Sequence, residues 1–139
     1  MEAICYTDGA SRGNPGKAAI GVVIIHTATK RQHTFSKFLG DKLSNNYAEY
    51  SAVIFCLKRL IEAGIKTFEL RADSELMVRQ INGDYMVSSK NIIPLHDEVK
   101  ELLSEFTSYK FVHVRRKYNK LADQLANRAL DKEKNGQPK

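Results

Sequence analysis

The chain has 139 residues, 42% of them hydrophobic, which is enough for one domain with a sizeable buried core. Lysines and arginines outnumber acidic residues by 22 to 16, and the net charge of +6 favours a polyanionic partner. Two cysteines without C-x-x-C spacing argue against a disulfide framework or a structural zinc site, and no apolar run approaches the roughly 18 residues of a membrane span. We therefore expect a cytoplasmic protein that is not held in a membrane.

Three strands are expected in the first third of the chain, at residues 2–8, 19–26 and 32–39. Each stretch is short and rich in β-branched and aromatic residues, and turn-forming or polar segments separate them. The pattern predicts an antiparallel meander.

The spacing of apolar residues becomes helical from Ser44, and this helix is expected to stop at Gly64. Strands and helices then alternate. We expect a strand over 66–74, helices over 74–82 and 94–106, a strand over 109–116 and a last helix over 119–132. The order predicts an α/β fold in which helices pack on the faces of one mixed sheet, with a single domain at 1–132 and a polar C-terminal tail at 133–139.

The glycine-rich stretch "YTDGASRGNPGK", residues 6–17, has the composition of a phosphate-binding loop but the spacing of none. A P-loop would need glycine in place of Ser11 and Ser or Thr in place of Ala18, and the glycines also miss the G-x-G-x-x-G spacing of dinucleotide sites. What remains is Asp8, which we expect at the end of the first strand.

Four acidic residues fall where the predicted sheet and helices meet. Glu49 and Asp123 each share a helix face with apolar residues, and Asp8 and Asp73 each close a strand that is expected to be central. A buried charge without a partner is costly, and one hard divalent cation would satisfy all four acids at once. The alternative for each acid taken alone is a helix cap or an arginine partner elsewhere.

The stretches "YTDGASRGNPG", "NNYAEYSAV", "ADSELMVRQING" and "NKLADQLAN" resemble, in this order, the four motifs of the type 1 ribonuclease H family, and the resemblance extends from Ile4 to Leu130. It implies a five-stranded mixed sheet with helices on both faces, a ribonuclease H-like fold. It also implies a monomeric endoribonuclease that hydrolyses the RNA strand of RNA/DNA hybrids with two Mg²⁺ ions, for which Mn²⁺ can substitute. The family's catalytic, metal-binding carboxylates fall on Asp8, Glu49, Asp73 and Asp123.

The resemblance also implies residues that contact the substrate. Those expected along the RNA strand are Ser11, Gly13 and Asn14. The expected minor-groove readers are Asn45 and Asn46, and Ser44 is expected in a pocket for a DNA-strand phosphate. Glu75 stands where many relatives carry glutamine, and Asn119 is expected to support the site from behind the ligands. For Ser44 and Asn45 the alternative is simple helix capping.

Two features depart from the better-known bacterial pattern. The segment between Ile81 and Pro94 is too short for the basic helix and handle that many relatives use to hold hybrid. The stretch "RRKYNK" before Asp123 lacks the glycine-histidine pair of many relatives, so the sequence does not assign the role of that histidine. Substrate affinity is then expected from scattered basic residues, with candidates at Arg12, Lys17, Lys90, Arg115, Arg116 and Lys117.

Two other functions remain open at this point. One is a hybrid-binding module that has lost its chemistry, and the other is a nuclease or integrase that places carboxylates on a similar sheet. The presence of all four acids speaks against the first. The asparagine pair before Glu49 and the stretch "DGASRGNPG" speak against the second.

Overall fold

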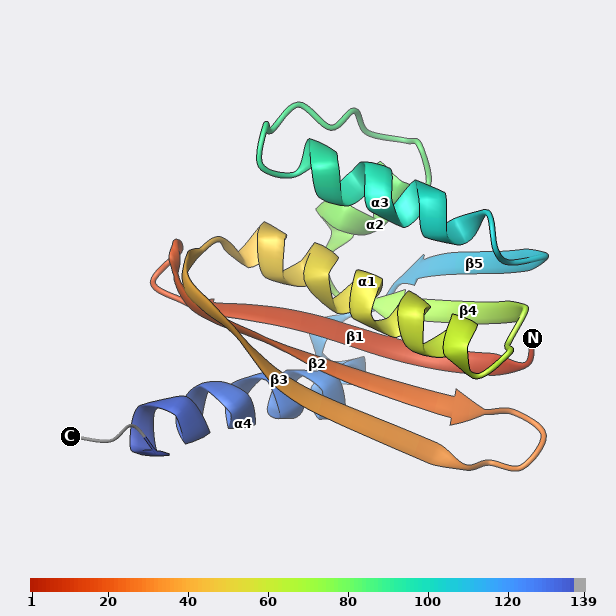
Figure 1. The fold of residues 1–139 in the computed structure, drawn as a ribbon, viewed down its shortest axis with the longest axis horizontal. Helices are drawn as coiled ribbons and strands as arrows, with labels where there is room; N and C mark the ends of the chain where they lie inside the picture. The colour runs from red at the N-terminus through yellow and green to blue at the C-terminus, as the bar shows by residue number, and fades with distance from the viewer. Residues whose placement is uncertain (137–139) are drawn as a thin grey trace.

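The computed structural model describes residues 1–136 and shows one five-stranded mixed sheet (Figure 1). Its strands are β1 (Ala3–Arg12), β2 (Gly16–His26), β3 (Gln32–Leu43), β4 (Thr67–Ala72) and β5 (Ser108–His113). They lie in the order β3-β2-β1-β4-β5. The first three are antiparallel, and β4 and β5 run parallel to β1. The expected meander and five-stranded mixed sheet are confirmed.

Helices cover both faces of this sheet, as the sequence predicts (Figure 1). The α-helices are α1 (Asn45–Glu62), α2 (Glu75–Ile81), α3 (Ile93–Leu103) and α4 (Lys120–Gly136), and a 3₁₀ turn, η1, spans Arg116–Tyr118. On one face α1 packs on β1 and β2, and α3 packs on α1. On the opposite face α4 packs on β2, β3 and β1. None of the helices in residues 1–136 is long and apolar enough to cross a membrane.

The sheet opens beside Asp8. The parallel ladder between β1 and β4 ends at the pair Thr7 and Ala72, whereas β1 continues along β2 as far as the pair Arg12 and Lys17. Asp8 therefore has a paired strand on one side only. No residue of β4 pairs with Asp8. Asp73, the first residue after β4, lies close to it instead.

The glycine-rich stretch is a β-hairpin rather than a loop that follows a short strand. β1 runs through Arg12, so Asp8 lies inside the strand instead of closing it, and that expectation was wrong. The reason is that β2 supplies partners for the backbone from Gly9 to Arg12. The glycine composition reflects close packing: a Cβ on Gly9 would lie 2.2 Å from the carbonyl carbon of Ala48 on α1.

Other boundaries differ by a few residues. β3 extends to Leu43, because Gly40 and Leu43 still pair with β2, and α3 ends at Leu103 rather than 106. At the C-terminus α4 continues through Gly136, so part of the segment expected as a tail is helical. Residues 137–139 lie outside the described residues.

Candidate active site

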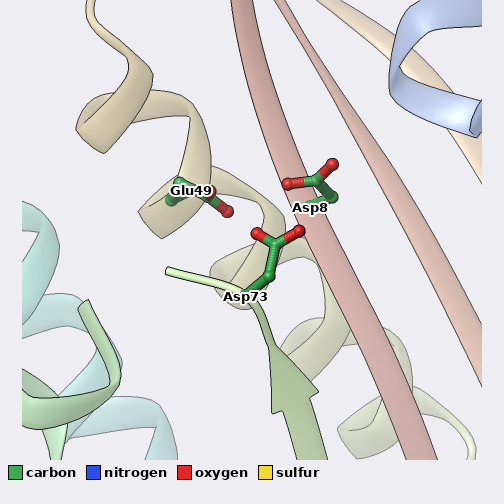
Figure 2. A group of neighbouring side chains, drawn as sticks. All are labelled: Asp8, Glu49 and Asp73. Carbon is green, nitrogen blue, oxygen red and sulfur yellow. The ribbon is translucent and has the colours of Figure 1, made fainter. Parts of the chain in front are cut away.

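Three carboxylates from distant parts of the chain meet at the opening in the sheet (Figure 2). Asp8 comes from β1, Glu49 from α1, and Asp73 directly follows β4. One carboxylate oxygen from each lies within 4.8 Å of the others. Such a cluster of oxygen donors is the ligand type that hard cations prefer.

The local sequence explains why Glu49 reaches this position. Because Gly9 has no side chain, the first turns of α1 lie directly against β1. The amide of Gly9 then donates a hydrogen bond of 3.0 Å to Oε1 of Glu49. The helix face predicted from the apolar spacing is confirmed, since Glu49 is buried together with Val53, Cys56, Leu57 and Leu60.

Asp123 belongs to the same cleft but not to the tight cluster. The cleft has a volume of about 450 Å³, and Asp123 of α4 lines it with the other three acids. Its carboxyl group lies beside that of Asp8 and contributes to raising the pKa of Asp8. The side chain of Asp123 is 29% exposed, whereas Asp8 and Glu49 are buried. The structure therefore brings all four predicted acids to one cleft. Three of them have carboxylate oxygens close enough together to bind one metal ion.

Burial and like charge make this cluster reluctant to ionise. Burial, followed by the charges of Glu49 and Asp73, raises the pKa of Asp8, and burial with the charge of Asp73 raises that of Glu49. Burial also raises the pKa of Asp73, against the opposing effects of an Asn119 hydrogen bond and the Arg116 charge. A cation bound by the acids would remove both causes, because it replaces water as the partner of each carboxylate.

Asn119, which the resemblance assigns to support of the site, lies next to the acidic cluster. It is 1% exposed, and its Nδ2 donates to the backbone oxygen of Thr7, the residue before Asp8, at 2.9 Å. The same side chain interacts with Asp73. Its Oδ1 has no hydrogen-bond partner among the described residues. Asn119 thus links β1, the strand that carries Asp8, to the carboxyl group of Asp73.

The hairpin tip and the start of α1 are tied together by residues expected to contact substrate. The amide of Ser11 donates to Oδ1 of Asn45 at 2.8 Å, and the amide of Asn45 donates to Oδ1 of Asn14 at 3.0 Å. Ser44 is the N-cap of α1, where its hydroxyl accepts from the amide of Tyr47 at 3.0 Å. Capping is therefore a role of Ser44, while its expected phosphate contact stays a prediction.

The other expected substrate residues have different surroundings. Gly13 turns the hairpin with φ of +84°, and Oδ1 of Asn46 is buried without a partner among the described residues. Glu75 faces Arg79 of its own helix at 2.9 Å and does not line the cleft. Ser11 and Asn45 are the members of this set that line the cleft together with the four acids.

Two contacts to the cleft were not foreseen. Arg116, considered only as a phosphate contact, lies 3.9 Å from Oδ1 of Asp123, and Asn127 donates to the same oxygen at 3.1 Å. The signal for Asn127 was present, because residues four apart on a helix are neighbours. No comparable signal marked Arg116, since the path of the segment before α4 depends on tertiary packing.

The sheet order, the helices on both faces and the acidic cluster at the opening define a ribonuclease H-like α/β domain. The family model described as "Reverse transcriptase-like" matches residues 6–129. Ribonuclease HI of Halobacterium salinarum is 38% identical over 126 residues, which cover 91% of this chain and 63% of that protein. Ribonuclease H of Clostridium botulinum is 33% identical over 147 residues, which cover 92% of this chain and 95% of that protein.

A solved structure agrees with these relatives. LC11-RNase H1 in complex with RNA/DNA hybrid superimposes with a TM-score of 0.84 at 37% identity, over 94% of this chain and 97% of that one. The chain belongs to the type 1 ribonuclease H family. It spans 63% of the length of the Halobacterium relative and 36% of the length of three mycobacterial relatives.

Proposed function

We propose that the protein is an endoribonuclease that hydrolyses the RNA strand of RNA/DNA hybrids by a two-metal-ion mechanism with Mg²⁺. The observation that carries this proposal is the meeting of three carboxylates within 4.8 Å at an open cleft in a basic protein. The names of the relatives support the chemistry, and the hybrid bound to LC11-RNase H1 supports the substrate.

The donors present fit a hard divalent cation. Asp8, Glu49 and Asp73 would hold it, with Asp123 completing the set, and all four donate oxygen, which suits Mg²⁺ and Mn²⁺. Bound Mg²⁺ would activate water and stabilise the charge that develops on the attacking and leaving oxygens of a phosphodiester. The chain's own contribution is to present these oxygens on separate, well-packed elements of the fold.

Recognition of the hybrid is assigned to the two sides of the cleft. In this proposal Ser11, Gly13 and Asn14 at the hairpin tip follow the RNA strand, and Asn45 and Asn46 read the minor groove. Contacts to 2′-hydroxyls in this wide groove distinguish RNA from DNA without reading base sequence. The hydrogen bonds between the hairpin and α1 support the assignment, because they hold both reading elements in one orientation.

Three further residues have supporting roles in the proposal. Ser44, whose hydroxyl already caps α1, lies near the helix N-terminus, where a DNA-strand phosphate would be stabilised. Glu75 is the weaker assignment because Arg79 occupies its carboxylate. Asn119 orients the acids from behind through Thr7 and Asp73.

The main competing function is a hybrid-binding module without catalysis. The two are separated by labelling either strand of a hybrid in turn, adding Mg²⁺, and determining which strand is cut. We expect cleavage of the RNA strand and none of the DNA strand or of duplex DNA. Glu49→Gln serves as the matched inactive control. Binding without any cleavage would favour the module, and comparable cutting of the DNA strand would refute the ribonuclease assignment.

A further inference from the structure

The side chain of Asn127 bridges an acid of the cleft and an arginine of the hairpin tip. Asn127 lies one turn after Asp123 on α4, and its Nδ2 donates to Oδ1 of Asp123 at 3.1 Å and to the backbone oxygen of Asp123 at 3.0 Å. Its Oδ1 accepts from Nη2 of Arg12 at 3.2 Å. The amide thus turns its donor end toward an anion and its acceptor end toward a cation.

This polarity leaves the amide one favourable orientation. A flipped amide would place its oxygen against the two oxygens of Asp123 and its NH₂ group against the guanidinium of Arg12. Arg12 is itself anchored, because its Nη2 contacts Oδ1 of Asp131 on the next turn of α4 at 2.7 Å. The contacts therefore form one continuous series from Asp131 through Arg12 and Asn127 to Asp123.

Asp123 needs such support more than Asp8 and Glu49 do. Asp8 and Glu49 are held by burial, whereas the side chain of Asp123 is 29% exposed and would otherwise sample several rotamers. Asn127 and the more distant Arg116 both face the same oxygen, Oδ1. With Oδ1 held by these two residues of the cleft wall, the carboxyl group keeps its place beside Asp8.

We propose that Asn127 and Arg12 are positioning residues for Asp123: Asn127 holds the carboxylate directly, and Arg12 holds the amide of Asn127 in the orientation that allows this. The inference rests on the proposed function, since it assigns Asp123 to the metal-binding set. It also couples the end of β1, which carries Arg12, to the acid on α4.

The first test measures Mg²⁺ binding without substrate. Asn127→Leu keeps the number of side-chain heavy atoms and a good helix former while removing all three side-chain hydrogen bonds, and Asn127→Ala is a second variant if the first folds poorly. Thermal melts across a Mg²⁺ titration give the concentration for half-maximal stabilisation. We expect this concentration to rise roughly 10- to 100-fold, the usual effect of removing a group that orients a metal ligand. The Mg²⁺ midpoint of hybrid cleavage should rise in parallel.

A double-mutant cycle tests the role of Arg12. If Arg12 acts on Asp123 only through Asn127, Arg12→Ala should raise the Mg²⁺ midpoint less than Asn127→Leu does. The double variant should match Asn127→Leu alone. Asp131→Asn is the control, because its side-chain oxygen can still accept from Arg12, and its Mg²⁺ midpoint should stay within about twofold of wild type.

Two results would overturn the inference. One is an unchanged Mg²⁺ midpoint in Asn127→Leu, even if its melting temperature in chelator falls, because that outcome describes a merely structural residue. The other is full additivity of Arg12→Ala and Asn127→Leu, which would mean that Arg12 acts by a separate route. A wild-type protein that binds Mg²⁺ but leaves hybrid intact would instead refute the proposed function and leave the positioning role standing.

Discussion

Glu49→Gln separates a structural carboxylate from a metal ligand, because the two roles predict opposite changes in stability. The replacement has the same shape and keeps an oxygen that can accept from the amide of Gly9, so only the charge is lost. If an internal cation paired with Glu49, removing the charge would strand that cation and destabilise the fold by about 3–5 kcal/mol. In the arrangement observed, its close neighbours Asp8 and Asp73 are themselves acids, so the loss of charge relieves repulsion.

The size of this relief follows from the geometry. Two unit charges at 4.8 Å, the limit of separation within the cluster, repel by about 3.5 kcal/mol at an effective dielectric constant near 20. The raised pKa values of Asp8 and Glu49 mean that these two carboxyl groups hold protons at neutral pH, which removes part of the repulsion, so we expect a gain of about 1–3 kcal/mol in the metal-free protein. This corresponds to a melting temperature higher by roughly 4 to 12 °C.

The gain should depend on pH in a defined direction. A carboxyl group whose pKa is raised on folding binds more protons in the native state than in the unfolded state, so its contribution to stability falls as pH rises from its ordinary pKa toward the raised value. The glutamine amide of the variant does not titrate in this range. The variant and the wild type should therefore have similar stability near pH 4.5, and the advantage of the variant should grow up to pH 8.

The assay is a pair of thermal melts at each pH, in chelator and in Mg²⁺, beside a hybrid-cleavage assay. In Mg²⁺ the variant should gain less stability than wild type, because weaker binding gives a smaller linkage contribution, and cleavage should be nearly abolished. Glu69→Gln is a matched control: Glu69 is 22% exposed and pairs with Arg71 at 2.7 Å, so its loss should cost up to about 1 kcal/mol regardless of Mg²⁺. A loss of several kcal/mol by Glu49→Gln in chelator would refute the reasoning, and so would near-normal cleavage.

Three other predictions concern hybrid binding, the packing of Gly9 against α1, and the pH dependence of Mg²⁺ affinity. Replacing Arg115, Arg116 and Lys117 together by glutamine should weaken hybrid binding and reduce the slope of log K against log salt by about one to two, and an unchanged slope would show that these side chains are only solvated. Gly9→Ala should destabilise the protein by about 2–4 kcal/mol and also reduce its stabilisation by Mg²⁺, because the new Cβ would meet the backbone of Ala48. A melting temperature equal to that of wild type would contradict the close approach of β1 and α1. Finally, Mg²⁺ affinity should decrease as pH falls from 8 to 5, because the cation must displace protons from carboxyl groups of raised pKa. Calorimetry in buffers of different ionisation enthalpy should detect the released protons. An affinity that does not depend on pH would argue against these acids as the ligands.

The local elements were largely predictable, and so were the acids that meet in the cleft. The period of apolar residues predicted α1 and placed Glu49 on its buried face, because the interior selects residues every three or four positions along a helix. Asp73 was correctly placed at the end of a strand segment, and Asp123 on the last helix. Each of these inferences depends on residues that are neighbours in the chain, which is the information that a sequence states directly.

Contacts between elements were decided by the tertiary structure. Where β1 ends depends on β2, whose backbone continues to pair as far as Arg12, so the glycine-rich stretch could not be recognised as a hairpin from its composition. The support of Asp123 depends likewise on Arg12, which lies far from α4 in the chain. No local pattern specifies a partner at such a separation.

The sequence by itself determined which four acids the protein carries and on what kind of element each lies, because period and motif are local properties. Only the tertiary structure decided that Asp8 and Asp73 face each other, since this follows from the register of two strands whose parallel ladder stops at Thr7 and Ala72. A slip of one residue in that ladder would turn every side chain of one strand to the opposite face and separate the acids. The physical reason is that register is set by the simultaneous packing of both faces of the sheet, here by α1 against Gly9 and by α4 against Gly21.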